Sequence, residues 1–104
     1  MESKELLEQA REILDSKKAV DLKTIATTTQ TIIADYFLIA TGTSSTHVRA
    51  LADELEASLK AQGVTARGIE GRTTGWILLD YGTVLVHIFT KDQREYYNIE
   101  RLWE

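Results

Sequence analysis

The chain has 104 residues and no cysteine, which is enough for one buried core and excludes disulfide frameworks and thiolate metal sites. Its formal net charge is −4 and its Lys and Arg residues are scattered, so we expect little direct nucleic-acid binding and an acidic surface suited to a basic protein partner. No apolar run approaches the ~18 residues of a membrane span, and the first residues lack a signal peptide's apolar segment, so we expect a cytoplasmic protein without membrane contact.

Residues 1–104 are expected to form one domain, because the chain has no linker, internal repeat or low-complexity segment. The first predicted element is a helix over Ser3–Leu14, with Ser3 as its N-cap. Its buried face consists of Leu6, Ala10, Ile13 and Leu14. Lys17 and Lys18 follow it, where cations complement the carboxyl end of the helix dipole.

Two strands are predicted next. Ala19–Ile25 alternates apolar and polar side chains, which is typical of a half-buried strand near a sheet edge. Asp35–Thr41 is apolar on both alternating faces, as in a central strand that is covered on each side. Thr27–Thr31 has no apolar pattern and is predicted to connect them.

A long helix is predicted over Thr46–Gln62, with Gly63 as its stop signal. Its buried stripe consists of Val48, Leu51, Ala52, Leu55 and Leu59, whereas Asp53, Glu54, Glu56 and Lys60 face water. Val64–Ile69 is predicted as a short strand, and Glu70–Gly75 as a polar loop.

The next segment predicts a β-hairpin with strands at Trp76–Asp80 and Thr83–Phe89 and a tight turn at Tyr81-Gly82. The tail Lys91–Glu104 is predicted to fold back as a short helix and an extended end, which buries its apolar side chains. Together these elements predict a single α/β domain with a mixed sheet of about five strands flanked by helices.

Alternation along the first hairpin strand predicts two faces. One face carries Trp76, Leu78 and Asp80, and the other carries Ile77, Leu79 and Tyr81. If the second set faces the core, the first is open to a partner, and Trp and Tyr dominate binding hot spots. Tyr81 begins the turn and could be reached from either side. The alternative is that Trp76 only covers the core beneath Glu70–Gly75.

The turn Gly42-Thr43-Ser44 is a candidate enzyme site, because amides at a helix N-terminus bind anions and nucleotidyltransferases place a Gly-Ser turn there. Such enzymes also need paired carboxylates to hold magnesium. Neither Asp35 nor Asp80 has a second carboxylate two residues away. Helix capping by Ser44 or Ser45 explains the turn, and a small nucleotide-binding or nucleotidyltransferase-like enzyme is the alternative function.

His47 and His87 are the two histidines, and without cysteine or a His-x-x-x-His pair they predict no zinc site. A triad with a serine and an aspartate can be drawn, but no nucleophile-elbow motif supports it. On a strand, His87 is typical of a hydrogen-bonded structural histidine, which could reach the Gly-Thr-Ser turn. We therefore expect no catalytic residue, no metal and no cofactor.

Three segments resemble the Iojap family of ribosomal silencing factors, in the family's order and spacing. They are Asp35–Val48 (DYFLIATGTSSTHV), Trp76–Phe89 (WILLDYGTVLVHIF) and Arg94–Trp103 (REYYNIERLW). Tyr81 is the main departure, because it stands where members vary between Tyr and other apolar residues. The matching residues Asp35, Gly42, Ser44 and His47 are assigned to fold and turn structure.

The resemblance implies a nucleotidyltransferase-like α/β fold that lacks the catalytic carboxylates, and a protein that is not an enzyme. It implies binding to the large ribosomal subunit through large-subunit ribosomal protein number fourteen, where the small subunit docks. Translation is then repressed sterically when nutrients run short. A role in large-subunit assembly and a homodimer off the ribosome are also implied.

Carried onto this chain, the resemblance assigns six partner-binding residues: Glu70, Gly71, Trp76, Leu78, Asp80 and Tyr81. Asp80 is expected to meet a basic side chain of the ribosomal protein. Trp76→Ala and Tyr81→Ala are expected to leave the fold intact and to weaken co-sedimentation with large subunits.

Overall fold

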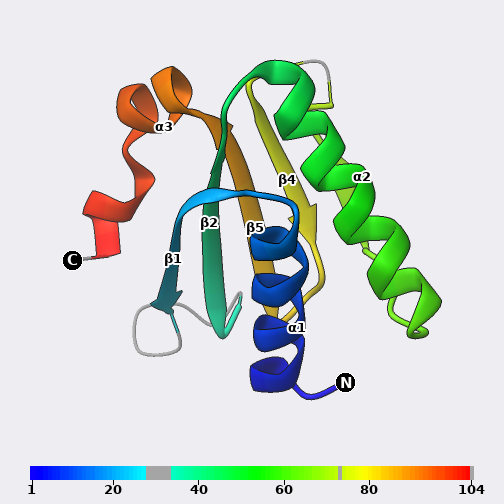
Figure 1. The fold of residues 1–104 in the computed structure, drawn as a ribbon. Coiled ribbons are helices and arrows are strands. Elements are labelled where there is room, and N and C mark those ends of the chain that lie inside the picture. Colours follow the sequence, from blue (N-terminus) through cyan, green and yellow to red (C-terminus); the bar gives the residue numbers. More distant parts are fainter. Residues whose placement is uncertain (28–33, 73, 104) are drawn as a thin grey trace.

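The computed structural model describes residues 1–27, 34–72 and 74–103. The elements, in chain order, are α1 (Ser3–Ser16), β1 (Val20–Ala26), β2 (Tyr36–Gly42), α2 (Ser45–Ala61), β3 (Gly68–Glu70), β4 (Trp76–Asp80), β5 (Val84–Thr90), α3 (Lys91–Tyr97) and the 3-10 helix η1 (Ile99–Trp103). The strands form one five-stranded sheet in the order β1-β2-β5-β4-β3 (Figure 1). β2 and β5 are parallel and the other neighbours are antiparallel, so the predicted mixed α/β fold is confirmed.

Helices α1 and α2 lie beside each other over one face of the sheet (Figure 1). Their sequences explain this, because each helix has an apolar stripe at helical spacing. All five residues predicted for the α2 stripe are fully buried. In α1 the buried residues are Leu6, Leu7, Ala10 and Leu14, and Ile13 is partly buried against them. The main core therefore lies between these two helices and the sheet.

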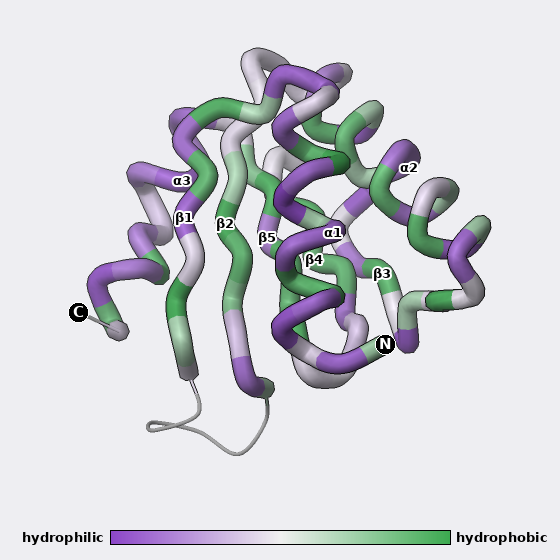
Figure 2. Tube along the Cα trace, turned by 60° about the horizontal axis from the view of Figure 1, so that its bottom comes forward, coloured by the Kyte–Doolittle hydropathy of each residue, from purple (hydrophilic) through white to green (hydrophobic). Residues whose placement is uncertain are grey.

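The C-terminal segment, α3 and η1, covers part of the opposite face. Figure 2 shows the apolar strands β2 and β5 between this segment and the α1–α2 layer. A second, smaller core of Ile25, Ile39 and Phe89 lies there, with Phe37, Trp76, Ile99 and Trp103 packed against it. One face of the sheet is thus closed by helices, and the other is closed only in part.

The two long helices begin differently. Ser44 caps α2 as predicted, because its Oγ accepts the His47 N–H at 3.0 Å. The predicted cap at Ser3 is wrong: Ser3 is already helical, and Glu2 is the N-cap, without a side-chain hydrogen bond. The Glu2 carbonyl accepts the Leu6 N–H at 2.8 Å, so the first turn of α1 is closed by backbone alone.

At the end of each long helix, two backbone amides beyond the last turn donate hydrogen bonds to carbonyls of that turn. In α2, Val64 N–H donates to the Leu59 carbonyl while Gly63 adopts a φ of 84°, so the predicted stop at Gly63 is confirmed. In α1 the equivalent left-handed residue is Lys18, with a φ of 70°. The backbone of Lys18 therefore helps to end the helix, in addition to the predicted interaction of its charge with the helix dipole. Lys17 forms an ion pair with Glu54, with Nζ and Oε1 3.2 Å apart.

The strands follow the predicted pattern, apart from the start of the short strand before β4. β1 lies at the sheet edge and β2 is an interior strand, as predicted. The short strand begins at Gly68 and not at Val64, because the Val64 amide is used to end α2. The predicted connection Thr27–Thr31 lies outside the described residues except for Thr27, whose Oγ1 donates to the Ala34 carbonyl at 2.7 Å.

The tail was predicted to finish in an extended end, and this is wrong. It continues as η1 after Asn98, which adopts a φ of 44° and donates its N–H to the Arg94 carbonyl at 2.8 Å. Trp103 packs edge-on against Phe37 with ring centroids 5.1 Å apart, whereas Leu102 is 77% exposed. In the described part of the chain, no helix is long and apolar enough to span a membrane.

Candidate protein-binding surface

The hairpin sorts its side chains as the alternation predicts. Ile77 and Leu79 are fully buried under α1 and α2, and the other three residues of β4 are partly exposed on the opposite face. Pairing with β3 adds neighbours on that face, because cross-strand partners project to the same side. Glu70 is paired with Leu78, and Gly68 with Asp80.

Two adjoining hollows lie on this outer face of β3 and β4. The larger one, of about 270 Å³, is lined by Glu70, Gly71, Trp76 and Leu78. The smaller one, of about 100 Å³, is lined by Gly68, Glu70, Leu78 and Asp80. We call the surface formed by these six residues the β3–β4 surface. It brings together five of the six predicted partner-binding residues, with apolar side chains between two carboxylates.

Tyr81 is the exception, and its predicted place on an accessible surface is wrong. Its side chain is only 8% exposed and belongs to the main core, on the face covered by α1 and α2. The reason is that the alternation of inward and outward side chains along β4 continues one residue into the turn, so Tyr81 points inward like Leu79. Among the described residues its hydroxyl has no hydrogen-bond partner, and burial raises the pKa of Tyr81 to about 12. Tyr81→Ala is therefore expected to damage the core.

Two members of the surface also have structural tasks. Gly71 adopts a φ of 85°, and a Cβ on it would lie 2.1 Å from the Trp76 carbonyl oxygen, so no other residue fits there without a backbone shift. Asp80 Oδ1 accepts the Gly82 N–H at 2.8 Å and so shapes the hairpin turn, in which Gly82 has a φ of 82°. Replacing Asp80 by Asn keeps this acceptor and removes the charge.

Trp76 is held on three sides. Its ring stacks on Phe89 with centroids 4.9 Å apart and an interplanar angle of 27°, and it meets Tyr97 at 4.7 Å. Its Nε1–H donates to His87 Nδ1 at 3.1 Å. The ring therefore covers the second core and also lines the larger hollow.

His87 is a hydrogen-bonded structural histidine, as predicted, but its partner is Trp76 and not the Gly-Thr-Ser turn. The ring is 6% exposed, and burial lowers the pKa of His87 to about 4, so it is neutral at neutral pH. Alternation already places Trp76 and His87 on one face of the hairpin, so the signal for this contact was present in the sequence.

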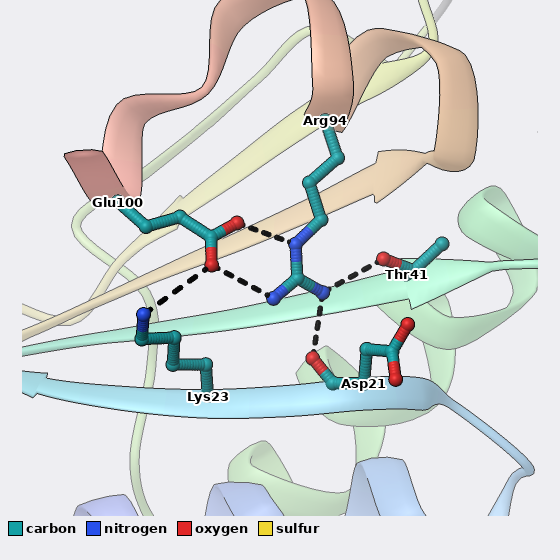
Figure 3. A network of polar contacts seen from close by, with 5 residues as sticks. All are labelled: Asp21, Lys23, Thr41, Arg94 and Glu100. Carbon is teal, nitrogen blue, oxygen red and sulfur yellow. Dashed lines mark hydrogen bonds and ion pairs between the residues drawn. The ribbon is translucent and has the colours of Figure 1, made fainter.

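Arg94 forms a polar centre that the sequence did not reveal (Figure 3). Its Nε donates to Glu100 Oε1 at 2.6 Å, and its Nη1 donates to the Asp21 carbonyl at 2.6 Å and to Thr41 Oγ1 at 2.8 Å. Lys23 Nζ lies 3.7 Å from Glu100 Oε2. Arg94 lowers the pKa of the Glu100 carboxyl through these hydrogen bonds. This network fixes α3 and η1 to β1 and β2.

The Gly42-Thr43-Ser44 turn uses its polar groups internally. Thr43 N–H donates to His47 Nδ1 at 2.9 Å, and the other ring nitrogen of His47 lies 2.9 Å from the Lys17 carbonyl. The His47 N–H is taken by the Ser44 cap. These amides are the ones a phosphate would need, so the contacts favour helix capping over nucleotide binding. Across the described residues, no group of three or more His, Asp or Glu side chains could hold a metal ion.

Comparison with known proteins gives concordant matches. Residues 1–104 match the family described as "RsfS: Ribosomal silencing factor during starvation". A ribosomal silencing factor of Halalkalibacterium halodurans is 41% identical over 104 residues, which cover 99% of this chain and 89% of that protein. The crystal structure of a Chromobacterium violaceum protein has a TM-score of 0.96 at 38% identity and covers 99% of this chain and 87% of its own.

A more distant relative comes from mouse. It is named "Mitochondrial assembly of ribosomal large subunit protein 1" and is 30% identical over 95 residues, which cover 88% of this chain and 42% of the mouse protein.

Proposed function

The chain belongs to the family of ribosomal silencing factors, and from this premise we propose that it binds the large ribosomal subunit and sterically blocks joining of the small subunit. The mouse relative, named for large-subunit assembly, supports the choice of subunit and a second role in large-subunit biogenesis. The protein then acts in the cytoplasm by occupying a surface and needs no catalytic group. We also propose large-subunit ribosomal protein number fourteen as its direct partner, and a homodimer off the ribosome.

The observation that carries this proposal is the chemistry of the β3–β4 surface. Trp76 and Leu78 supply apolar area, and Glu70 and Asp80 supply negative charge at its margins. A long basic side chain fits such a surface, because its methylene groups can lie on the indole and the leucine while its cation meets the carboxylates. Ribosomal proteins are rich in such side chains, which suits a basic protein partner better than RNA.

The proposal is tested by co-sedimentation with purified large subunits and by binding to the isolated ribosomal protein. Glu70→Lys is the sharpest variant, because Glu70 is exposed and its replacement leaves the core unchanged. We expect about tenfold weaker binding, since the reversal removes one attraction and adds one repulsion, each on the order of 0.5–1 kcal/mol. Trp76→Ala is expected to weaken binding by at least ~30-fold, as for a central hot-spot residue.

Glu12→Lys provides the matched control, because Glu12 is equally exposed but lies on α1, on the other side of the sheet. It makes the same charge change and is expected to bind as the unmodified protein does. If Glu70→Lys and Trp76→Ala both fold and both bind normally, the partner-binding surface lies elsewhere on the protein. Failure of the unmodified protein to sediment with large subunits, or to reduce their joining with small subunits, would overturn the function itself.

A further inference from the structure

The hydrogen bond between Trp76 and His87 fixes the state of the imidazole. An indole N–H can only donate, so His87 Nδ1 must be unprotonated where it accepts at 3.1 Å. The proton of the neutral ring is then on Nε2. The lowered pKa of His87, caused by burial, keeps this acceptor available at neutral pH.

This arrangement leaves a buried donor unsatisfied. His87 Nε2 has no hydrogen-bond partner among the described residues, and the ring is 94% buried between aromatic side chains. Its centroid lies 4.9 Å from Phe37 and 6.2 Å from Phe89. A leucine at this position would pack among the same rings and remove the Nε2 donor, but it would also take the acceptor from the Trp76 N–H, whose half-buried side chain can turn to water.

What the imidazole supplies, and an apolar side chain does not, is the acceptor at Nδ1. Stacking on Phe89 and contact with Tyr97 hold the Trp76 ring, and the hydrogen bond to Nδ1 fixes the direction of its N–H edge. With that edge bound inward, the ring offers a partner its apolar surface at the hollow beside Glu70 and Leu78, and no N–H donor.

We propose that His87 is a positioning residue of the β3–β4 surface: it binds the Trp76 indole N–H and holds the ring in the orientation that the partner meets. This inference rests on the proposed function, since it concerns the same surface. Its chemical consequence is that the partner group over Trp76 is apolar or cationic, and does not act as a hydrogen-bond acceptor for the indole.

The test compares His87→Leu, Trp76→Phe and the double variant. In His87→Leu we expect an unchanged or raised melting temperature, a shift of the Trp76 indole signal in ¹H–¹⁵N spectra, and three- to tenfold weaker binding to large subunits, the range for ordering one freed side chain. Trp76→Phe identifies the indole signal and lacks the donor. In that background, His87→Leu should weaken binding no further.

Three outcomes overturn the inference. These are unchanged binding by His87→Leu, additive losses in the double variant, and a fall in melting temperature that accompanies the loss of binding, which indicates a merely structural role. If the unmodified protein does not bind large subunits, the proposed function fails. The indole signal then decides the positioning claim by itself, because an unshifted signal in His87→Leu contradicts it.

Discussion

Two buried side-chain polar atoms lack a hydrogen-bond partner in the described part of the chain, the Tyr81 hydroxyl and His87 Nε2. They lie on opposite faces of the sheet, Tyr81 in the main core and His87 under Trp76. An unsatisfied buried donor typically costs about 1–3 kcal/mol, so both residues are retained against a local loss of stability. For His87 we infer a gain in surface geometry. For Tyr81 the structure shows no compensating contact of the hydroxyl.

Tyr81 gives a pH-dependent prediction. Burial raises its pKa from 10.0 to about 12, so the unfolded chain releases the phenolic proton at a lower pH than the folded chain does. Stability from this group is complete below pH 10 and is lost as the pH rises through 12. The loss approaches roughly 2–3 kcal/mol, because each pKa unit corresponds to about 1.4 kcal/mol.

The measurement is urea unfolding from pH 8 to pH 12, with Tyr81→Phe as the control. Phenylalanine fills the same space without the hydroxyl, so it should be at least as stable at pH 8 and should lack this part of the alkaline decline. Tyr81→Ala is expected to lose about 3–5 kcal/mol at pH 8 by opening a cavity, and this difference should shrink above pH 10, where the unmodified protein itself loses stability. Parallel pH curves for the unmodified protein and Tyr81→Phe would contradict this reading of Tyr81.

At the scale of elements, Arg72 and Arg94 each form ion pairs between separate segments of the chain. Arg72 binds Asp53 and Glu56 of α2 at 2.6 and 2.7 Å, and Arg94 binds Glu100 at 2.6 Å. The distances are alike but the surroundings differ, because the Arg72 side chain is 44% exposed and that of Arg94 is 13% exposed. Solvent screens the first site far more than the second.

We therefore expect unequal effects from the same substitution. Arg94→Ala should lower the free energy of unfolding by about 1.5–3 kcal/mol and speed amide exchange in α3 and η1, because it removes the Arg94 donor from the Glu100 carboxylate and from the Asp21 carbonyl. Arg72→Ala should cost about 0–1 kcal/mol. Urea unfolding and hydrogen exchange measure both. Equal losses would show that Arg94 does not fix the C-terminal segment.

Features of single helices and strands could be predicted where residues close together in the sequence determine them. The α2 stripe, the Ser44 cap and the two faces of β4 follow from periods of 3.6 and 2, and they are confirmed. Boundaries such as Ser3 and Val64 failed because backbone hydrogen bonds, and not side-chain type, decide where those elements begin. The Arg94 contacts could not be predicted, since the Asp21 and Thr41 partners lie 73 and 53 residues away in the chain.

At the scale of the whole molecule, the net charge and the local charge of the β3–β4 surface are expected to have opposite effects on the affinity for the ribosome. A protein with a net charge of −4 is repelled by ribosomal RNA, whereas Glu70 and Asp80 attract a basic protein surface. Salt weakens both the repulsion and the attraction, so the change of affinity with salt concentration shows which of the two is larger.

We expect binding to large subunits to weaken as salt rises from about 50 to about 200 mM, because in the proposed binding mode the acidic pair meets a basic side chain at short range. The decline should be shallower for Glu70→Lys and unchanged for Glu12→Lys. Sedimentation at several salt concentrations measures this dependence. Binding that strengthens with salt would mean that repulsion from RNA dominates and that the acidic pair faces no cation.

The parallel pairing of β2 with β5 has a consequence for how the chain reaches its native state. The β4–β5 hairpin joins neighbours in sequence, but β2 meets β5 only after α2, β3 and β4 have been traversed. Closing that long loop costs entropy before any contact compensates for it. We therefore expect the hairpin to form early and its docking onto β2 to set the rate of refolding.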